Sequence, residues 1–188
     1  MMALKPLPPH GDLRQLLRYE PDTGRLFWKE RGPEWFDGSA FACDMMAARW
    51  NGQFCGREAF TSTTKQGYKQ GTLLGIKYLA HRLVYAIFHG TTDFEFLDHI
   101  NRDKTDNRIC NLREASSYQN MCNLPSRGGT SRYRGVSWRA KDKVWIAKAQ
   151  FKGAVLRSSP LKCEIEAAKK YNEMALSLQG EFAILNPV

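Results

Sequence analysis

An adjacent Asp-His pair within a polar stretch is the part of the sequence best suited to chemistry. Asp98 and His99 precede a run rich in Asp, Asn and Arg, and Asn111 and Asn120 follow it. A histidine with a pKa near neutrality can take a proton from water, and carboxylate and amide oxygens suit Mg2+ or Mn2+. Phosphodiester hydrolysis needs such a base and such a cation. These residues therefore indicate metal-assisted hydrolysis; the alternative for each residue alone is turn capping.

These side chains require a scaffold of two strands and a helix. A short strand is predicted to end at Asp98 and His99, a second strand lies at 111–113, and a helix is predicted over 116–122. Neighbouring residues of a strand point to opposite faces. At the end of a strand, Asp98 and His99 can nevertheless flank one site. The pattern predicts a β-hairpin with a polar loop, backed by a helix.

The order and spacing of these motifs resemble those of the HNH nucleases, in particular phage and intron-encoded homing endonucleases. The resemblance covers roughly residues 68–123. It is carried by His81-Arg82-Leu83-Val84, Asp98-His99-Ile100-Asn101, Asp106-Asn107-Arg108-Ile109, Asn111-Leu112-Arg113 and Gln119-Asn120.

The resemblance implies a ββα-metal unit with assigned roles. Asp98 and Asn120 would hold one divalent cation, His99 would be the general base, and Asn111 would brace the polar loop and so orient His99. Many relatives have histidine where Asn120 stands, and an oxygen ligand favours Mg2+ or Mn2+ over Zn2+; no structural zinc is expected. The other polar loop residues are then interpreted as shaping the loop: Asn101, Asp103 and Asp106.

The C-terminal third of the chain is basic and rich in aromatic residues. Residues 126–188 hold 12 of the 28 Lys and Arg but only five of the 19 Asp and Glu, in a chain of net charge +9. Such an imbalance indicates a polyanionic partner. Strands are predicted over 133–139, 144–151 and 154–159, and an amphipathic helix over 164–178. Period-two alternation places four polar side chains on the outer face of the sheet: Arg139, Lys148, Gln150 and Arg157.

Residues 131–186 resemble the APETALA/ethylene-responsive-factor DNA-binding domain. The motifs are Ser131-Arg132-Tyr133-Arg134-Gly135-Val136, Trp145-Ile146-Ala147, Glu166-Ala167-Ala168, Tyr171-Asn172 and the segment 180–186. The resemblance implies that the sheet enters the DNA major groove. The expected DNA-binding residues are Arg132, Arg134, Arg139, Lys148, Gln150 and Arg157. Ser137 and Cys163 depart from the family pattern. The alternative is a module that only packs against other protein.

We therefore predict an α+β chain of two parts. An HNH nuclease domain would span 1–123, with its core at 68–123 and a β-rich N-terminal extension at 11–67. A linker would cover 124–130, and the DNA-binding domain, a three-stranded antiparallel sheet on one helix, would cover 131–188. Within the first part, we expect a hairpin over 67–78, a helix over 80–89 and irregular structure over 32–60.

The expected function is a metal-dependent, site-directed DNA endonuclease, either a homing-type nuclease or a nickase, acting on double-stranded DNA. The alternatives are a non-catalytic DNA-binding regulator and a phage DNA-associated structural protein. Five cysteines without C-x-x-C spacing disfavour a disulfide framework. No membrane span or signal peptide is expected, so we predict a bacterial or phage-infected host cytoplasm. Target sequence and oligomeric state are left open.

Overall fold

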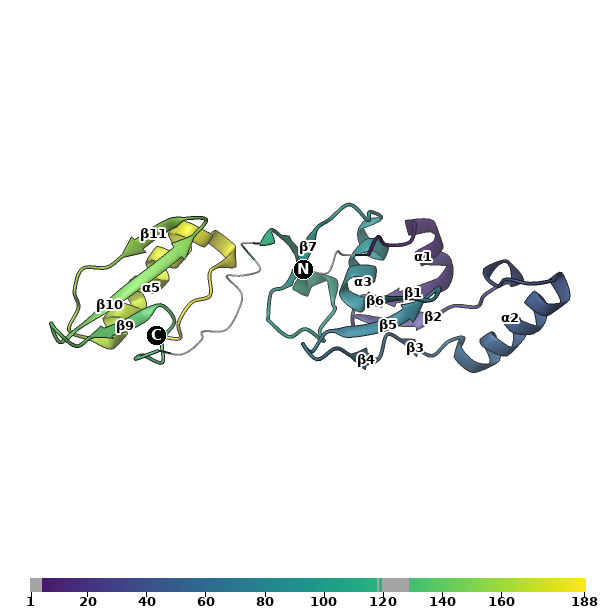
Figure 1. The fold of residues 1–188 in the computed structure, drawn as a ribbon, viewed down its shortest axis with the longest axis horizontal. Coiled ribbons are helices and arrows are strands. Elements are labelled where there is room, and N and C mark those ends of the chain that lie inside the picture. The colour runs from purple at the N-terminus through teal and green to yellow at the C-terminus, as the bar shows by residue number, and fades with distance from the viewer. Residues whose placement is uncertain (1–4, 118, 120–128) are drawn as a thin grey trace. The chain divides into compact units, whose positions relative to one another are not determined.

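The computed structural model describes residues 5–117, 119 and 129–188. The chain forms two compact units, Met1–Glu114 and Ala115–Val188 (Figure 1). The first contains helices and small sheets, and the described part of the second contains one antiparallel sheet and its helix. This mixture of separate helices and antiparallel strands confirms the α+β class. None of the helices in the described ranges is long and apolar enough to cross a membrane. The predicted linker lies almost entirely outside the described residues.

The first unit begins with a helix and a small sheet. Helix α1 (His10–Leu16) leads into β1 (Leu17–Glu20), which pairs with β2 (Arg25–Trp28). Strand β2 pairs on its other edge with β3 (Glu58–Ala59), so the strand order is β1-β2-β3. The leucines of α1 and β1 are at most 2% exposed and form part of the core.

Helix α2 (Ala40–Phe54) was not predicted, because the region 32–60 was expected to be irregular and the extension β-rich. A short 3-10 turn, η1 (Pro33–Trp35), precedes it, and the Ser39 hydroxyl caps it by accepting from the Ala42 amide. Only Cys43 and Ala47 of this 15-residue helix are buried. Because so few of its residues face the core, its sequence does not need the apolar stripe by which a core helix is recognised.

The next elements follow the prediction closely. Strands β4 (Ser62–Thr63), β5 (Lys69–Leu73) and β6 (Ile76–Leu79) form one antiparallel sheet, and helix α3 (Ala80–His89) ends at Gly90, whose φ is 72°. The α3 residues from Ala80 to Ala86 are buried. Helix α3 contacts α1, β1, β5 and β6 and therefore forms the centre of the first unit's core.

Two further strands close the first unit. Strand β7 (Phe96–His99) pairs with β8 (Leu112–Ala115), and a 3-10 turn, η2 (Ile109–Asn111), leads into β8. The intervening polar loop, residues 100–108, is the segment singled out in the sequence. A β-hairpin with a polar loop was predicted here and is confirmed, whereas most of the segment in which its helix was predicted lies outside the described residues.

The second unit contains the predicted three-stranded sheet and its helix. Strands β9 (Val136–Arg139), β10 (Val144–Phe151) and β11 (Ala154–Arg157) are antiparallel in the order β11-β10-β9. Helix α5 (Glu164–Gln179), followed by η3 (Gly180–Phe182), packs on β10. The close packing depends on small side chains, since five alanines of β10 and α5 are at most 1% exposed: Ala147, Ala149, Ala167, Ala168 and Ala175.

Candidate active site

Asp98 and His99 end strand β7, and both are buried, at 6% and 4% exposure. The backbone holds this strand end to the start of β8, because the Ile100 amide donates to the Asn111 carbonyl at 2.9 Å. The two side chains have different surroundings. Asp98 contacts Arg113 of β8, whereas His99 faces Asn107, Tyr68 and His81. The strand end thus carries a carboxylate and an imidazole with separate partners.

The Asp98 carboxylate forms an ion pair with Arg113. Arg113 donates to Oδ2 of Asp98 from Nε at 3.1 Å and from Nη2 at 2.9 Å. The two side chains are 7% and 15% exposed, so the pair is shielded from water. The ion pair holds the carboxylate at the strand end in one orientation.

His99 is fixed by a hydrogen bond between Nε2 and Oδ1 of Asn107, at 3.1 Å. An amide oxygen only accepts, so with this amide orientation Nε2 carries the proton and the lone pair lies on Nδ1. Burial lowers the pKa of His99, although Asn107 and nearby carboxylates oppose the effect. The ring is consequently neutral near pH 7 and able to accept a proton.

Asn107, to which the sequence reasoning assigned no role, is 1% exposed and is held from the other side by β1 and its turn. Its carbonyl accepts from the Tyr19 hydroxyl at 3.2 Å. Gly24 lies against the same backbone, with φ at 70°, and a Cβ on it would come within 2.6 Å of the Asn107 carbonyl carbon. The β1–β2 hairpin therefore supports the residue that touches His99.

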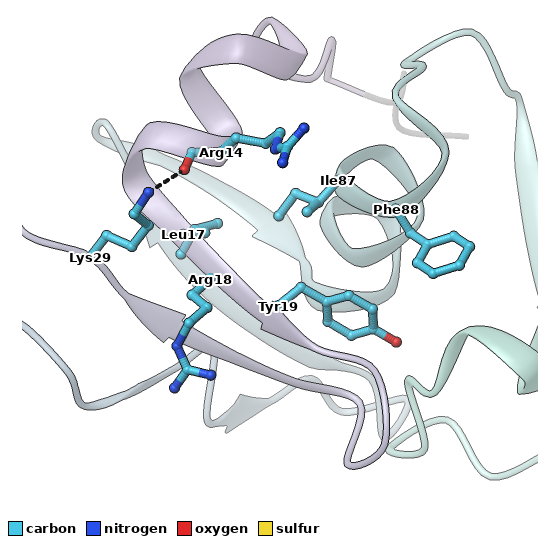
Figure 2. A pocket seen from close by; sticks show the side chains of 7 residues that line it. All are labelled: Arg14, Leu17, Arg18, Tyr19, Lys29, Ile87 and Phe88. Atoms are coloured by element: carbon cyan, nitrogen blue, oxygen red, sulfur yellow. Dashed lines mark hydrogen bonds between the residues drawn. The ribbon is translucent and has the colours of Figure 1, made fainter.

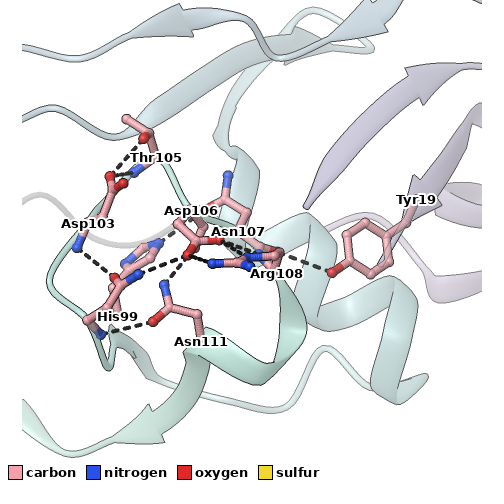
Figure 3. A network of polar contacts seen from close by, with 9 residues as sticks. Tyr19, His99, Asp103, Thr105, Asp106, Asn107, Arg108 and Asn111 are labelled. Atoms are coloured by element: carbon pink, nitrogen blue, oxygen red, sulfur yellow. Dashed lines mark hydrogen bonds and ion pairs between the residues drawn. The ribbon is translucent and has the colours of Figure 1, made fainter. Parts of the chain in front are cut away.

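Asn111 connects the two ends of the polar loop, as Figure 3 shows. Its Oδ1 accepts from the Asn101 amide at 2.9 Å, and its Nδ2 donates to the Asp106 carbonyl at 2.8 Å. Asn101 also donates to the Asp106 carboxylate and accepts from the Asp103 amide. Hydrogen bonds from Arg108 hold the pKa of Asp106 at about 2. Asn101, Asp103 and Asp106 thus hydrogen-bond within the loop, as expected of loop-shaping residues.

Two more rings pack against His99. The His81 and Tyr68 ring centroids lie 5.1 and 5.9 Å from that of His99, and 5.2 Å from each other. Burial lowers the pKa of His81 to about 3, so this ring is neutral. Its Nδ1 has no hydrogen-bond partner among the described residues. The rings of Tyr68 and His81 thus pack directly against the His99 ring.

The described part of the site supplies one of the two predicted metal ligands. Asp98 provides a buried carboxylate, while Asn120 lies outside the described residues. Within the described ranges, no cluster of three His, Cys, Asp or Glu side chains would form a metal site. A single carboxylate with an amide oxygen fits a cation that keeps several water ligands, as Mg2+ does.

The structure brings together four of the six predicted DNA-binding residues. Arg139, Lys148, Gln150 and Arg157 are exposed on the sheet face opposite α5, and Lys148 pairs directly with Arg157 across β10 and β11. Arg132 and Arg134 precede β9 and are bonded to tyrosines. Arg134 donates to the Tyr171 hydroxyl at 3.0 Å, and Arg132 to the Tyr133 hydroxyl at 2.8 Å. These two arginines thus lie off the outer sheet face.

A basic pocket of about 420 Å³ opens beside Tyr19 (Figure 2). Three of its lining residues are cationic, Arg14, Arg18 and Lys29, and Lys29 donates to the Arg14 carbonyl at 2.9 Å. Phe88 of α3 lies across the pocket from these cations, near the Tyr19 ring. Positive charge thus gathers next to the tyrosine that supports Asn107.

Comparison with known proteins finds similarity to one family. Residues 78–122 match the sequence model of the HNH endonuclease family. An uncharacterized HNH endonuclease, L560, of Acanthamoeba polyphaga mimivirus is 32% identical over 126 residues. This match covers 66% of the present chain and 65% of the viral protein. No solved structure matches the chain. The residues built into the Asp98–His99 site thus lie in the part of the chain that is similar to HNH endonucleases.

Proposed function

We propose that this protein is a metal-dependent DNA endonuclease that hydrolyses phosphodiester bonds at the Asp98–His99 site. The observation that carries the proposal is the environment of His99. The ring is buried, its pKa is lowered, and Asn107 holds the proton on Nε2. A neutral histidine with a defined lone pair beside a buried carboxylate is suited to removing a proton from water. The similarity of residues 78–122 to HNH endonucleases supports the same chemistry.

In this proposal, Nδ1 of His99 accepts the proton of the attacking water. Asn107 keeps the ring in the correct tautomer, so Nδ1 rather than Nε2 faces the reaction. Once protonated, the His99 ring is stabilised by the negative charges of three carboxylates, because each of them favours the positively charged imidazolium: Asp98, Asp103 and Asp106. Asn111 acts indirectly by closing the loop that carries Asn107.

We propose that Asp98 and Asn120 hold a single Mg2+ or Mn2+ ion. Such an ion supplies charge neutralisation at the phosphate and at the departing oxygen. Arg113 holds the Asp98 carboxylate in a fixed orientation through two hydrogen bonds to Oδ2. A site of this kind cuts one strand at a time, so nicking is the primary activity expected, and double-strand cleavage would require a second site or reorientation.

DNA is proposed to contact both units. The outer face of the second unit, with Arg139, Lys148, Gln150 and Arg157, would enter the major groove, as the resemblance of this module to ethylene-responsive-factor domains implies. Its exposed cations and amide suit phosphates and base edges. The basic pocket beside Tyr19 would contact backbone phosphates. A tethered reader raises the local concentration of the nuclease at its target, which suits a homing-type or site-directed enzyme.

The proposal is tested on a plasmid library of random inserts, because the target sequence is unknown. Incubation with Mg2+ or Mn2+, followed by sequencing of the new ends, should reveal discrete sites with 5′-phosphate and 3′-hydroxyl ends. Chelation by EDTA should abolish them. If the protein shifts the library in a gel but cuts none of it with either ion, the endonuclease proposal fails and a DNA-binding regulator is the better account.

A further inference from the structure

An aromatic pocket of about 470 Å³ lies between β2, η1, α2 and the β5–β6 turn, in the region that the sequence left without a function. Its walls are mostly rings, and one cation lies among them. The residues on which the inference depends are Trp28, Arg31, Trp35, Phe36, Trp50 and Phe54. The pocket belongs to the first unit alone and contains none of the Asp98–His99 site residues.

The rings are held in place as walls. Trp28 and Trp50 meet edge to face, with centroids 5.6 Å apart, and Trp50 stacks at a tilt on Phe54 at 5.3 Å. Phe60, which is 3% exposed, supports Trp28 from the core side at 5.6 Å. All the pocket rings remain partly exposed. Rigid, partly uncovered rings are the usual platform on which planar ligands stack.

Arg31 is buried in this pocket at 8% exposure. Its guanidinium carbon lies 3.9 Å from the Trp50 ring centroid and 5.2 Å from that of Trp28. Within the described residues, Nε has no hydrogen-bond partner and no carboxylate lies within ion-pair distance. Burial lowers the pKa of Arg31, but an arginine remains charged.

The position of this arginine is fixed by α2. The Asn51 side chain accepts from the Arg31 amide and donates to the Arg31 carbonyl, both at 2.9 Å. A buried donor without an acceptor is costly, so a ligand that offers an acceptor to the Arg31 Nε would be favoured in this pocket.

We infer that this pocket binds a single unstacked nucleobase of DNA. An aliphatic ligand would leave Arg31 unsatisfied, and a phosphate alone would leave the ring faces uncovered. A nucleobase meets both requirements, because its faces stack on the aromatic rings and its edge presents acceptor atoms to Arg31. Guanine offers O6 and N7 side by side, the pair of acceptors that an arginine fork matches best. The pocket therefore selects guanine over thymine.

The inference deepens the proposed function and rests on it for the choice of DNA as the partner. A base reaches such a pocket only from single-stranded or locally unpaired DNA. The pocket would thus hold a base extruded from the duplex and fix the register of the strand. The volume of 470 Å³ lies in the range of small-molecule sites.

The binding test uses the full chain carrying His99→Ala, in EDTA, so that no cleavage interferes. The ligand is a fluorescent seven-position DNA backbone, abasic except for one central guanine, and it is compared with a fully abasic strand and with a central thymine. We expect the guanine to raise affinity by about tenfold or more over the abasic strand. Thymine should bind more weakly than guanine.

Variants assign the effect to the pocket. Trp50→Ala should remove most of the base-dependent gain, and Arg31→Met should remove the preference for guanine over thymine. Thr72→Trp, at an exposed rim position, fills the pocket without deleting a wall and keeps the test valid if Trp50→Ala does not fold. The matched control is Phe41→Ser, because Phe41 lies on the opposite side of α2 and is 77% exposed.

Equal binding of the guanine and abasic strands by the parent protein would overturn the inference and indicate a site for backbone phosphate only. A base-dependent gain that survives both Trp50→Ala and Thr72→Trp would also overturn it. Because the readout is binding, a protein that passes this test but cuts no DNA would refute the endonuclease proposal alone. Conversely, a protein that cuts DNA without base-dependent binding would refute only the pocket.

Discussion

Replacing Asn107 with leucine should abolish the orientation of His99 while leaving the shape of the site nearly intact. Nδ2 of Asn107 is buried without a partner among the described residues, so an apolar side chain loses little there. The side-chain hydrogen bond that disappears is the one between Oδ1 and His99 Nε2 at 3.1 Å. The perturbation therefore removes one contact from the proposed general base.

The magnitude follows from the burial of that contact. The Nε2 proton would be left without an acceptor inside the protein, at a cost of about 1–3 kcal/mol. The ring would relieve this cost by rotating or by moving its proton to Nδ1, and both changes remove the productive base. Losing such an orienting partner typically costs 10- to 100-fold, so we expect the single-turnover cleavage rate to fall by roughly that factor.

The assay is single-turnover nicking of a labelled duplex, with DNA affinity and thermal unfolding measured in parallel. Affinity should be unchanged, because Asn107 is 1% exposed and cannot touch DNA. Asn107→Asp is the matched control, since a carboxylate oxygen can accept the same hydrogen bond and should retain more activity than leucine. A folded Asn107→Leu protein that cuts at the wild-type rate would refute the assigned role.

Three further substitutions test the surroundings. Gly24→Ala forces a side chain into a positive-φ position against the polar loop, and should lower the free energy of unfolding by roughly 2 kcal/mol. The control Gly11→Ala, in open space within α1, should be neutral or stabilising. Equal changes in stability for the two variants would contradict the packing of Gly24 on the polar loop. Arg113→Met removes the ion-pair partner of the buried Asp98, and in EDTA should cost about 3–5 kcal/mol in urea denaturation; an unchanged midpoint would argue against the pair. Arg157→Gln should reduce the slope of log affinity against log salt by about 1, whereas an unchanged slope would remove this residue from the DNA contact.

The elements that could be predicted are those whose own sequence carries the pattern. Helix α3 turns Ala80, Leu83 and Val84 to the core, and the β5–β6 hairpin bends at Leu74 and Gly75, which both have positive φ. Helix α2 could not be found in this way. Its ring-bearing residues line a pocket rather than a core, and Phe41 on its other side is exposed, so no stripe of buried residues marks it.

The same distinction applies to the candidate site. Asp98 and His99 were recognisable because an adjacent carboxylate and imidazole can bind a metal ion and accept a proton wherever they occur in a sequence. Asn107 looked like any loop asparagine, because the features that select it come from elsewhere: Tyr19 bonds to it across 88 residues, and Gly24 packs on its backbone. Its burial, which is the deepest among the polar residues of the loop, is likewise a property of the fold and leaves no mark in the sequence.

The central claim is that His99 is the base that activates water for DNA cleavage. It is tested most directly by the nicking rate of the wild-type protein and of His99→Ala on the same DNA in Mg2+, with DNA affinity measured beside it. A positioned general base contributes about 10²- to 10⁴-fold, so His99→Ala should lose at least 100-fold in rate while it still binds DNA. A folded His99→Ala protein that nicks within a fewfold of the wild-type rate would contradict the account.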